Sequence, residues 1–253
     1  MHNRNLIIYV FTLFIASCSF NLDVNKPINL LWDKFEGKSD SLIILLPGIY
    51  DTAEKFKDER FFTIARNAGI KADMVAANIH LWHLVQEMMI ERIEKDIFRQ
   101  VKNKGYKNIW FVGVSLGGLN SLLFYQKYTK DVCGVVVVSP YVADKGLTKE
   151  LKDAGGIKKW QPKVIQNKKT IEKRLQLLWV WLQQQDLKNN LNQVFLGYGK
   201  QDRYIESLKL FENILNKKNV VKVEGEHDWD AGQKIWQKQL TSRLKTGLLQ
   251  PCN

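Results

Sequence analysis

The sequence predicts an α/β fold, with a mostly parallel sheet covered by helices on both faces. Along the chain, short apolar runs with turn-like flanks alternate with longer stretches in which apolar residues recur at helical spacing. This alternation is typical of parallel strands joined by helices. The 253 residues are 45% hydrophobic and include only five prolines, which is enough apolar material for one ordinary globular domain. Disordered, collagen-like and coiled-coil proteins are excluded.

Six apolar runs are expected to be strands: 41–47, 72–76, 109–114, 132–139, 193–198 and 220–223. Four further stretches are expected to be helices: 84–104, 116–128, 204–216 and 231–245. The stretch 84–104 is amphipathic, because an apolar residue recurs every four positions between charged side chains, and Gly105 ends the pattern.

One segment, 141–192, interrupts the alternation. It contains eleven Lys and Arg against five Asp and Glu, and so carries half of the net charge of +12. Within it, 170–188 has a helical pattern whose middle is apolar all round, which indicates burial on more than one side or an exposed apolar face. We expect a helical cap over the sheet. In this cap Trp179 and Trp181 either line an acyl pocket or pack the cap onto the sheet.

The N-terminus has the layout of a secretory signal. Residues 1–5 are polar with one arginine, 6–16 form an apolar run, and a serine and Cys18 follow. As a helix this run would extend about 16 Å, half of a bilayer's hydrocarbon core, so a permanent membrane span is not expected. Residues 15–18 resemble a bacterial lipobox, which implies removal of 1–17 and lipid on Cys18. The serine after Cys18 favours the outer membrane in a Gram-negative source; the alternative is a plain signal peptide with an incidental cysteine.

The clearest catalytic motif of the sequence is Gly113-Val114-Ser115-Leu116-Gly117, a G-x-S-x-G motif between an expected strand and an expected helix. A serine at such a turn needs glycine two residues away on each side, because a Cβ there would collide as strand and helix come together. The turn raises the Ser115 hydroxyl above the sheet and aims the first helical amides, Leu116 among them, at a developing oxyanion. The motif predicts a nucleophile; the alternative is a glycine-rich helix start without chemistry.

A serine nucleophile needs a base, and the base needs an acid to hold it. Asp202 follows the expected strand 193–198, and His227 follows the expected strand 220–223. Each therefore lies just past the carboxyl end of a strand. Asp144, which follows another strand, is an alternative acid.

Other polar residues near these positions are expected to have lesser roles. His80 and His83 lie beside an expected strand end, where a histidine is more often structural than catalytic. Glu226 and Asp228 adjoin His227, but sequence neighbours rarely have the geometry to orient its ring, so solvated side chains are expected.

With Ser115, Asp202 and His227 in this order, the sequence resembles an α/β-hydrolase-fold esterase or lipase-like enzyme attached to a lipoprotein signal. The resemblance covers about residues 42–244. It implies that Ser115 is the nucleophile, that His227 is the general base and acid, and that Asp202 fixes the imidazole tautomer. The expected division is a signal peptide, a core in two parts and a helical cap insertion: 1–17, 18–140 with 193–253, and 141–192.

Two features depart from this family. Once residues 1–17 are removed, about twenty residues precede the first expected strand at 41, so the family's usual two leading strands are expected to be reduced or absent. Where many members carry His-Gly at the oxyanion loop, this chain has Leu46-Pro47-Gly48-Ile49-Tyr50. The second oxyanion amide, beside that of Leu116, is expected from Ile49, with Tyr50 as the alternative. Tyr50 is also a candidate pocket residue.

Metal, nucleotide and nucleic-acid chemistry find no support in the sequence. No Cys or His cluster has zinc-site spacing, and Cys133, in an apolar run, is expected to be an inert core residue that does not pair with Cys252 near the chain end. Residues 197–200 are too short for a phosphate loop. The excess of 38 Lys and Arg over 26 Asp and Glu is more often a solvated surface in an exported protein than a nucleic-acid site. No metal, cofactor or nucleic-acid partner is expected.

The sequence therefore indicates a lipid-anchored, exported serine hydrolase that cleaves carboxyl esters or thioesters through an acyl-enzyme on Ser115. The expected partners are a small-molecule or lipid ester and, through Cys18, a membrane; the oligomeric state is open. The alternatives are a non-catalytic binding or scaffold lipoprotein on the same fold, or a peptidase or acyltransferase of this fold. The serine, aspartate and histidine together argue against a scaffold, which has no physical need for all three.

Overall fold

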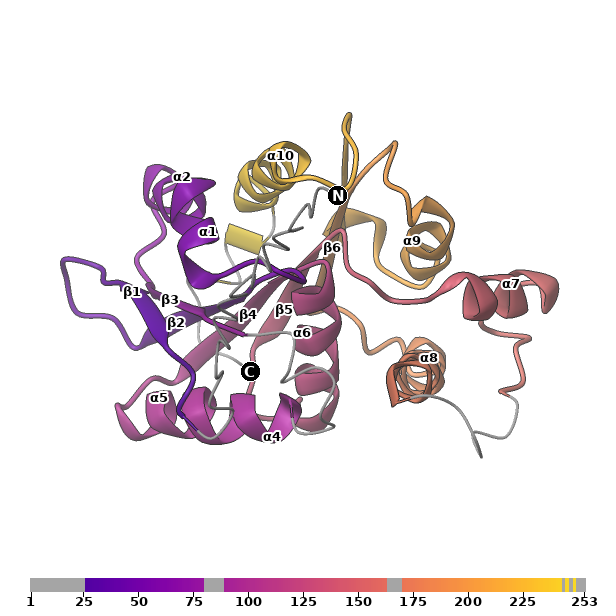
Figure 1. Ribbon diagram of the computed structural model, residues 1–253, viewed down its shortest axis with the longest axis horizontal. Coiled ribbons are helices and arrows are strands. Elements are labelled where there is room, and N and C mark those ends of the chain that lie inside the picture. The colour runs from indigo at the N-terminus through magenta and orange to yellow at the C-terminus, as the bar shows by residue number, and fades with distance from the viewer. Residues whose placement is uncertain (1–25, 80–88, 163–169, 243, 246–247, 249–253) are drawn as a thin grey trace, which may run out of the picture.

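The computed structural model describes residues 26–79, 89–162, 170–242, 244–245 and 248, which are organised around a seven-stranded sheet (Figure 1). The strands are β1 Leu30–Asp33, β2 Ser41–Leu46, β3 Asp73–Ala77, β4 Asn108–Val114, β5 Gly134–Val138, β6 Val194–Gly199 and β7 Val220–Val223. They lie in the order β1-β3-β2-β4-β5-β6-β7. Only β1 is antiparallel to its neighbour in this sheet. The predicted α/β class is confirmed.

All six predicted strands are present, with ends close to the predicted ones. The seventh, β1, was not predicted. It has four residues, all partly exposed, and it is a strand because it pairs with β3, where Trp32 lies opposite Val75. A four-residue run without alternation carries no such signal. One leading strand is therefore present where the sequence led us to expect reduction or absence.

Helices cover both faces of the sheet (Figure 1). One face carries α1 Ala53–Asp58, α2 Phe61–Asn67 and α10 Trp229–Leu240. The other carries α4 Met89–Ile93, η1 Glu94–Phe98, α5 Arg99–Asn103, α6 Leu116–Lys127, α8 Thr170–Leu187 and α9 Ile205–Glu212, and α7 Lys145–Asp153 lies outside this layer, against α9. A short 3₁₀ turn, η2 Lys217–Asn219, precedes β7. Strand β4 faces both layers, with Phe111 in one core cluster and Trp110 in the other, which explains its unbroken apolar run.

The predicted helices are confirmed within the described residues, with different ends. The stretch 84–104 is observed as α4, η1 and α5 in direct succession, with the middle part wound as a π-helix; its first five residues lie outside the described part. The other three are α6, α9 and α10. Helices α1 and α2 were not predicted, because six and seven residues are too few to show an amphipathic repeat.

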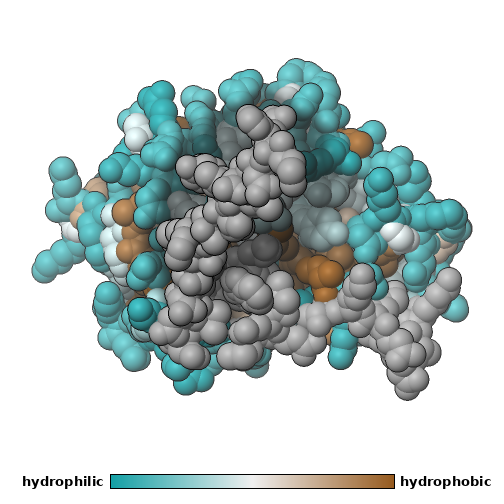
Figure 2. All heavy atoms as spheres, viewed as in Figure 1, coloured by the Kyte–Doolittle hydropathy of each residue, from teal (hydrophilic) through white to brown (hydrophobic). Residues whose placement is uncertain are grey.

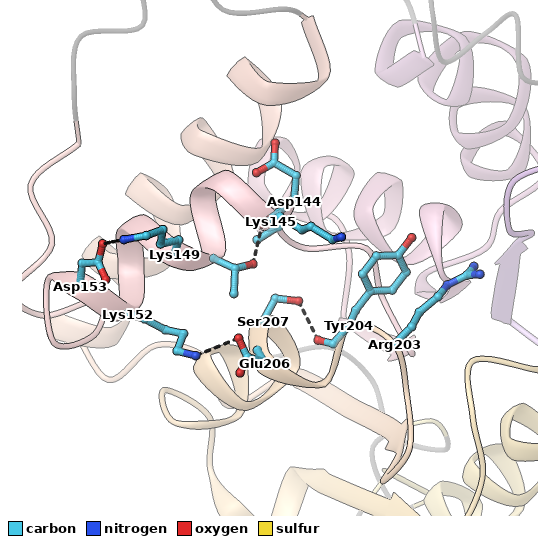
Figure 3. Close-up of a pocket in the computed structure, with 11 residues that line it drawn as sticks. Asp144, Lys145, Lys149, Lys152, Asp153, Arg203, Tyr204, Glu206 and Ser207 are labelled. Carbon is cyan, nitrogen blue, oxygen red and sulfur yellow. Dashed lines mark hydrogen bonds and ion pairs between the residues drawn. The ribbon is translucent and has the colours of Figure 1, made fainter.

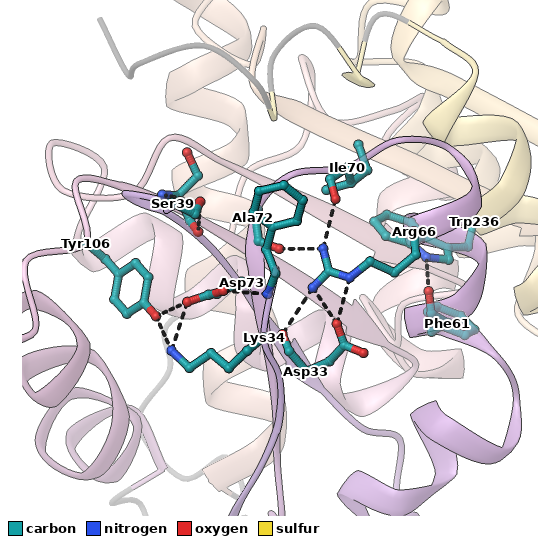
Figure 4. Close-up of polar contacts among 12 residues, drawn as sticks. Asp33, Lys34, Ser39, Phe61, Arg66, Ile70, Ala72, Asp73, Tyr106 and Trp236 are labelled. Atoms are coloured by element: carbon teal, nitrogen blue, oxygen red, sulfur yellow. Dashed lines mark hydrogen bonds and ion pairs between the residues drawn. The ribbon is translucent and has the colours of Figure 1, made fainter. Parts of the chain in front are cut away.

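Side-chain contacts hold the edge strand β1 and the loop after it against β3 and α2 (Figure 4). Lys34 Nζ lies 2.8 Å from Asp73 Oδ2, and the Phe35 amide donates a 2.8 Å hydrogen bond to Asp73 Oδ1. Arg66 Nε donates a 2.8 Å hydrogen bond to Asp33 Oδ1. The carboxyl end of β1 is thus fixed by charged groups from two other elements.

Helix α8 of the segment 141–192 is built into the core. Trp179 is fully buried, its Nε1 donates a 2.8 Å hydrogen bond to the Val142 carbonyl, and its ring contacts an aromatic ring of α9. Trp181 is also buried and packs edge-to-face on Tyr125 of α6. Contacts on two sides explain most of the apolar middle of this helix, while Leu177 is exposed. The division of the chain into a core and a separate cap stays a prediction.

The expectation of an inert, unpaired Cys133 is wrong. Cys133 is disulfide-bonded, and the chain's other two cysteines, Cys18 and Cys252, both lie outside the described residues. The signal peptide 1–17 also lies outside them, so its cleavage and lipidation stay predictions. Over the ranges that the structure covers, no helix has the length and apolarity needed to cross a membrane.

The described part of the face seen in Figure 2 presents mainly hydrophilic side chains, with hydrophobic residues in smaller patches between them. Large hydrophobic side chains are exposed at four described positions: Ile49, Tyr50, Leu177 and Leu187. Two of these are neighbours in the loop after β2. Two large hydrophobic side chains are therefore exposed in the loop at the edge where the predicted site lies.

The parallel strands bring five separate loops to one edge of the sheet. The carboxyl ends of β2, β4, β5, β6 and β7 point the same way, and such an edge is where open α/β sheets place their sites. The residues that leave the strands at this edge include Gly48, Ser115, Ser139, Asp202 and His227.

Candidate active site

Ser115 occupies a sharp turn between β4 and α6, with φ 51° and ψ −113°. Glycines on both sides make the turn possible. A Cβ on Gly113 would lie 2.3 Å from the Gly117 carbonyl oxygen, and a Cβ on Gly117 would lie 2.0 Å from the Leu46 carbonyl oxygen. No larger residue fits at either position, so the steric reason inferred from the motif is confirmed.

Ser115, His227 and Asp202 form one hydrogen-bonded chain. His227 Nε2 lies 2.9 Å from Ser115 Oγ, and His227 Nδ1 lies 2.9 Å from Asp202 Oδ2 and 3.1 Å from Asp202 Oδ1. With Nδ1–H donating to the carboxylate, Nε2 is left to accept the Ser115 proton. The three residues predicted from the sequence therefore have the geometry of a nucleophile, a base and an orienting acid.

The Asp202 carboxylate is fully buried and accepts several hydrogen bonds. The Tyr204 amide donates one of 2.8 Å to Oδ1, and the His227 ring donates another. Burial by itself would raise the pKa of Asp202, but the hydrogen bonds from His227, Tyr204 and the Ser139 hydroxyl outweigh it and lower that pKa. The carboxylate therefore stays ionised at neutral pH, as the imidazole needs when it takes up a proton.

Ser139 is a contributor that the sequence analysis missed. It directly follows β5, is almost fully buried and has φ 45°. Its amide donates a 2.7 Å hydrogen bond to the Gly197 carbonyl, which fixes the loop beside Asp202. A serine at the end of an apolar run was the available signal, but many strands end in a polar residue.

The rival residues have other structural roles. Asp144 caps α7, where its carboxylate accepts a 2.7 Å hydrogen bond from the Leu147 amide. Asp228 caps α10 in the same way, and Glu226 is exposed. His80 and His83 lie outside the described residues. None of the rivals within the described part is hydrogen-bonded to His227.

The expected oxyanion loop lies beside the nucleophile. A Cβ on Gly48 would be 3.6 Å from the Ser115 Cβ, and a turn closed by the Asp51 amide on the Gly48 carbonyl follows, with Tyr50 at φ 68°. The Ile49 amide lies within this turn. At the start of α6, the Ser115 side chain makes no capping hydrogen bond, so it leaves the first helical amides, Leu116 among them, for another acceptor.

Asp51 is a second residue that the sequence analysis missed. Its Oδ2 lies 2.8 Å from the position that a Cβ would take if one were added to Gly48. This carboxylate therefore packs directly on the loop beside Ser115. Burial raises the pKa of Asp51, while a hydrogen bond from Trp229 opposes the rise. Because Trp229 begins α10, two residues after His227, Asp51 links the loop after β2 to the loop that carries the histidine.

The three candidate pocket residues are not alike. Tyr50 is 81% exposed, in the loop whose Gly48 lies beside Ser115. Trp179 and Trp181 are buried core side chains. The contacts of Trp179 with α9 and of Trp181 with α6 favour the packing interpretation, and the acyl-pocket interpretation stays a prediction.

Comparisons with known proteins agree with this fold. The model of an uncharacterised protein family, UPF0227, matches residues 66–239. Est1E from Butyrivibrio proteoclasticus is similar in structure, with a TM-score of 0.62, 14% identity, and coverage of 88% of this chain and 95% of that chain. FphF, a fluorophosphonate-binding serine hydrolase of Staphylococcus aureus, has a TM-score of 0.60 and 13% identity, over 85% of this chain and 98% of that chain.

S-formylglutathione hydrolase (FrmB) from Staphylococcus aureus is similar as well, with a TM-score of 0.55 and 15% identity, over 79% of this chain and 80% of that chain. At such identities the likeness concerns the fold, which is the α/β-hydrolase fold. No curated protein sequence matches the chain.

Proposed function

We propose that this chain, which belongs to the uncharacterised protein family UPF0227, is a serine hydrolase that cleaves carboxyl esters or thioesters through an acyl-enzyme on Ser115. The observation that carries the proposal is the continuous hydrogen-bonded chain from Ser115 Oγ through His227 to Asp202. The likeness to esterases in fold supports it, as does the strained turn that presents the serine at the strand edge.

The reaction begins at Ser115. Its Oγ attacks the substrate carbonyl carbon while His227 Nε2 takes the hydroxyl proton, and the carbonyl π pair moves onto oxygen. The amides of Leu116 and Ile49 donate to this oxyanion. His227 then gives the proton to the leaving oxygen or sulfur as its bond to carbon breaks. Water, deprotonated by His227, repeats the attack on the acyl-enzyme and releases the acid with Ser115 restored.

Asp202 supports both half-reactions without touching the substrate. Its ionised carboxylate holds the Nδ1–H tautomer of His227 and stabilises the imidazolium that forms when Nε2 takes a proton. The hydrogen bonds from Tyr204 and Ser139 keep this carboxylate ionised. Asp202, Tyr204 and Ser139 are therefore positioning residues for the histidine.

Labelling with a fluorophosphonate probe tests the proposal, because such a probe phosphonylates only an activated serine. The purified chain should be labelled with one equivalent, at Ser115 by peptide mass spectrometry, and Ser115→Ala should remain unlabelled. Turnover of a panel of 4-nitrophenyl esters and acyl thioesters should follow the labelling. A folded protein that neither reacts with the probe nor turns over any member of the panel would make the chain a binding module on this fold.

We also propose that the protein is exported and held at a membrane by lipid on Cys18. The apolar run 6–16 and the lipobox-like residues 15–18 support this. The disulfide bond of Cys133 supports export as well, since structural disulfides persist mainly in oxidising compartments. Metabolic labelling with a clickable fatty acid, with Cys18→Ser as the control, tests the attachment.

A further inference from the structure

A cavity of about 560 Å³ lies between α7 and α9 (Figure 3). It is lined mainly by charged side chains of these helices and of the loop before α9: Asp144, Lys145, Lys149, Lys152, Asp153, Arg203 and Glu206, with Tyr204, Thr148, Ser207 and Ala143. A second cavity, of about 630 Å³, shares Asp144, Lys145 and Tyr204 with the first. The two cavities therefore meet at the Tyr204 ring.

Tyr204 separates the cavity from the triad. On one side its ring packs edge-to-face on the His227 imidazole, with centroids 5.1 Å apart, and its amide is bonded to Asp202. On the other side it lines both cavities. Tyr141, which lines the second cavity, contacts the Tyr204 ring and donates its amide to the Ser115 carbonyl at 3.0 Å. A molecule bound in the cavity would therefore lie one aromatic ring away from the reacting atoms.

The carboxylates of the first cavity already have partners. Asp153 is paired with Lys149, and Glu206 with Lys152 at 2.8 Å. Asp144 accepts the Leu147 amide as the cap of α7. Two of these carboxylates are therefore neutralised by lysines, and the third is bonded to the N-terminus of α7.

Two cations remain. Lys145 and Arg203 both line the first cavity, and neither forms an ion pair within the described residues. The Arg203 guanidinium lies over the Tyr204 ring, 5.2 Å from its centroid, and the Lys145 side chain extends toward the same ring (Figure 3). The second cavity lacks Arg203 and instead contains Glu150 and Glu172, so an anion is favoured in the first cavity.

We propose that the first cavity is a subsite for a carboxylate or phosphate group carried by the ester substrate, with Lys145 and Arg203 as its specificity-determining residues. The inference rests on ester hydrolysis at Ser115. Arginine presents a planar fork of donors suited to both groups, and lysine adds a second positive charge to the same cavity. The substrates are then esters that carry a carboxylate or phosphate group on the acyl side or on the leaving group.

Matched ester pairs test this subsite. Mono-4-nitrophenyl glutarate is compared with 4-nitrophenyl butyrate for a charge on the acyl side, and 4-acetoxybenzoate with phenyl acetate for a charge on the leaving group. In one of the two pairs, kcat/KM for the anionic ester should exceed that for the neutral ester by about tenfold or more, chiefly through a lower KM. Added inorganic phosphate should inhibit the same reaction competitively.

Variants decide whether Lys145 and Arg203 cause the preference. The double variant Lys145→Met, Arg203→Met should reduce the anionic-to-neutral ratio of kcat/KM to about one. The charge-conserving double variant Lys145→Arg, Arg203→Lys should retain most of the ratio. Lys209→Met, which removes an exposed charge from α9 outside the cavity, should leave the ratio unchanged. A ratio that fell equally in Lys209→Met would show attraction by the overall positive charge and would overturn the subsite.

The outcomes also separate the two proposals. Turnover of the neutral esters without preference for either anionic ester would overturn the subsite and leave the hydrolase standing. Absence of both turnover and fluorophosphonate labelling would overturn both. Thermal unfolding of each variant shows whether a lost ratio reflects a lost fold.

Discussion

The imidazole Nε2 of His227 lies 2.9 Å from Ser115 Oγ, although 112 residues separate the two in the sequence. The contact exists because β4 and β7 are parallel members of one sheet, and their carboxyl-end loops meet at one edge. The ring is held from behind by Asp202 and from the side by Tyr204. The nucleophile and the base therefore act as one preorganised unit.

Removing either member of this pair should abolish most of the activity. Ser115→Ala and His227→Ala should each lower kcat for a neutral 4-nitrophenyl ester by several orders of magnitude. The double variant should be no worse than the more damaged single variant, because the two groups serve one step. Steady-state kinetics on the purified variants measure this, with thermal unfolding as the check on folding. Losses that multiply in the double variant would mean that the two residues work independently.

The sequence predicted the triad but not its supports, for a physical reason. Ser115 is marked by glycines that its own turn requires, and Asp202 and His227 each follow an apolar run that is recognisable locally. Ser139 and Asp51 become important only through contacts with loops far away in the sequence. The strand β1 likewise depends on its pairing with β3. Local patterns cannot encode such partners.

The pKa of Asp202 predicts how stability responds to acid. Burial opposes ionisation, but the hydrogen bonds from His227, Tyr204 and Ser139 lower the pKa in the folded protein. The ionised carboxylate therefore stabilises the fold above its unfolded pKa of about 4, and this contribution is lost as the pH falls through the lower folded value. Asp202→Asn should be less stable than the unchanged protein at pH 7, with a difference that shrinks below about pH 4.

Urea unfolding at a series of pH values measures this difference. Asp228→Ala, which removes the cap of α10, is the comparison. It should lower the free energy of unfolding by about 1 kcal/mol and should lower kcat far less than Asp202→Asn does. A difference for Asp202→Asn that stayed constant from neutral to strongly acidic pH would be inconsistent with a lowered pKa.

Gly117→Ala should prevent stable folding, whereas Gly232→Ala should be tolerated. The new Cβ at position 117 would lie 2.0 Å from the Leu46 carbonyl oxygen, which is backbone and cannot move aside. At position 232, in α10, the nearest atom would be 3.7 Å away, and alanine is the better helix former. Soluble yield and the urea midpoint compare the two variants. A Gly117→Ala protein with the normal midpoint and unchanged labelling by fluorophosphonate would contradict the close approach of α6 to β2 at this turn.

Trp179→Ala should destabilise the protein by about 3–5 kcal/mol, as truncation of a large core side chain does. The ring is fully buried against α9, and its Nε1 hydrogen bond holds the Val142 carbonyl at the start of the insertion. Trp179→Phe, which keeps an aromatic ring, should lose less stability and retain the preferred acyl length. A stable Trp179→Ala with an altered acyl preference would instead support the acyl-pocket interpretation of this residue.

Lipid attachment at Cys18 and the disulfide of Cys133 constrain each other. A diacylglycerol thioether uses the Cys18 sulfur, which then cannot form a disulfide. Since the chain has three cysteines and Cys133 is disulfide-bonded, a lipidated chain leaves Cys252 as its partner. Mass spectrometry of the mature protein should therefore find an acylated N-terminal Cys18 peptide and, without reduction, a Cys133–Cys252 peptide. Two or three acyl chains would anchor the protein stably, at about 0.8 kcal/mol for each buried methylene. A Cys18–Cys133 disulfide, or a free N-terminus at another residue, would exclude the lipid anchor.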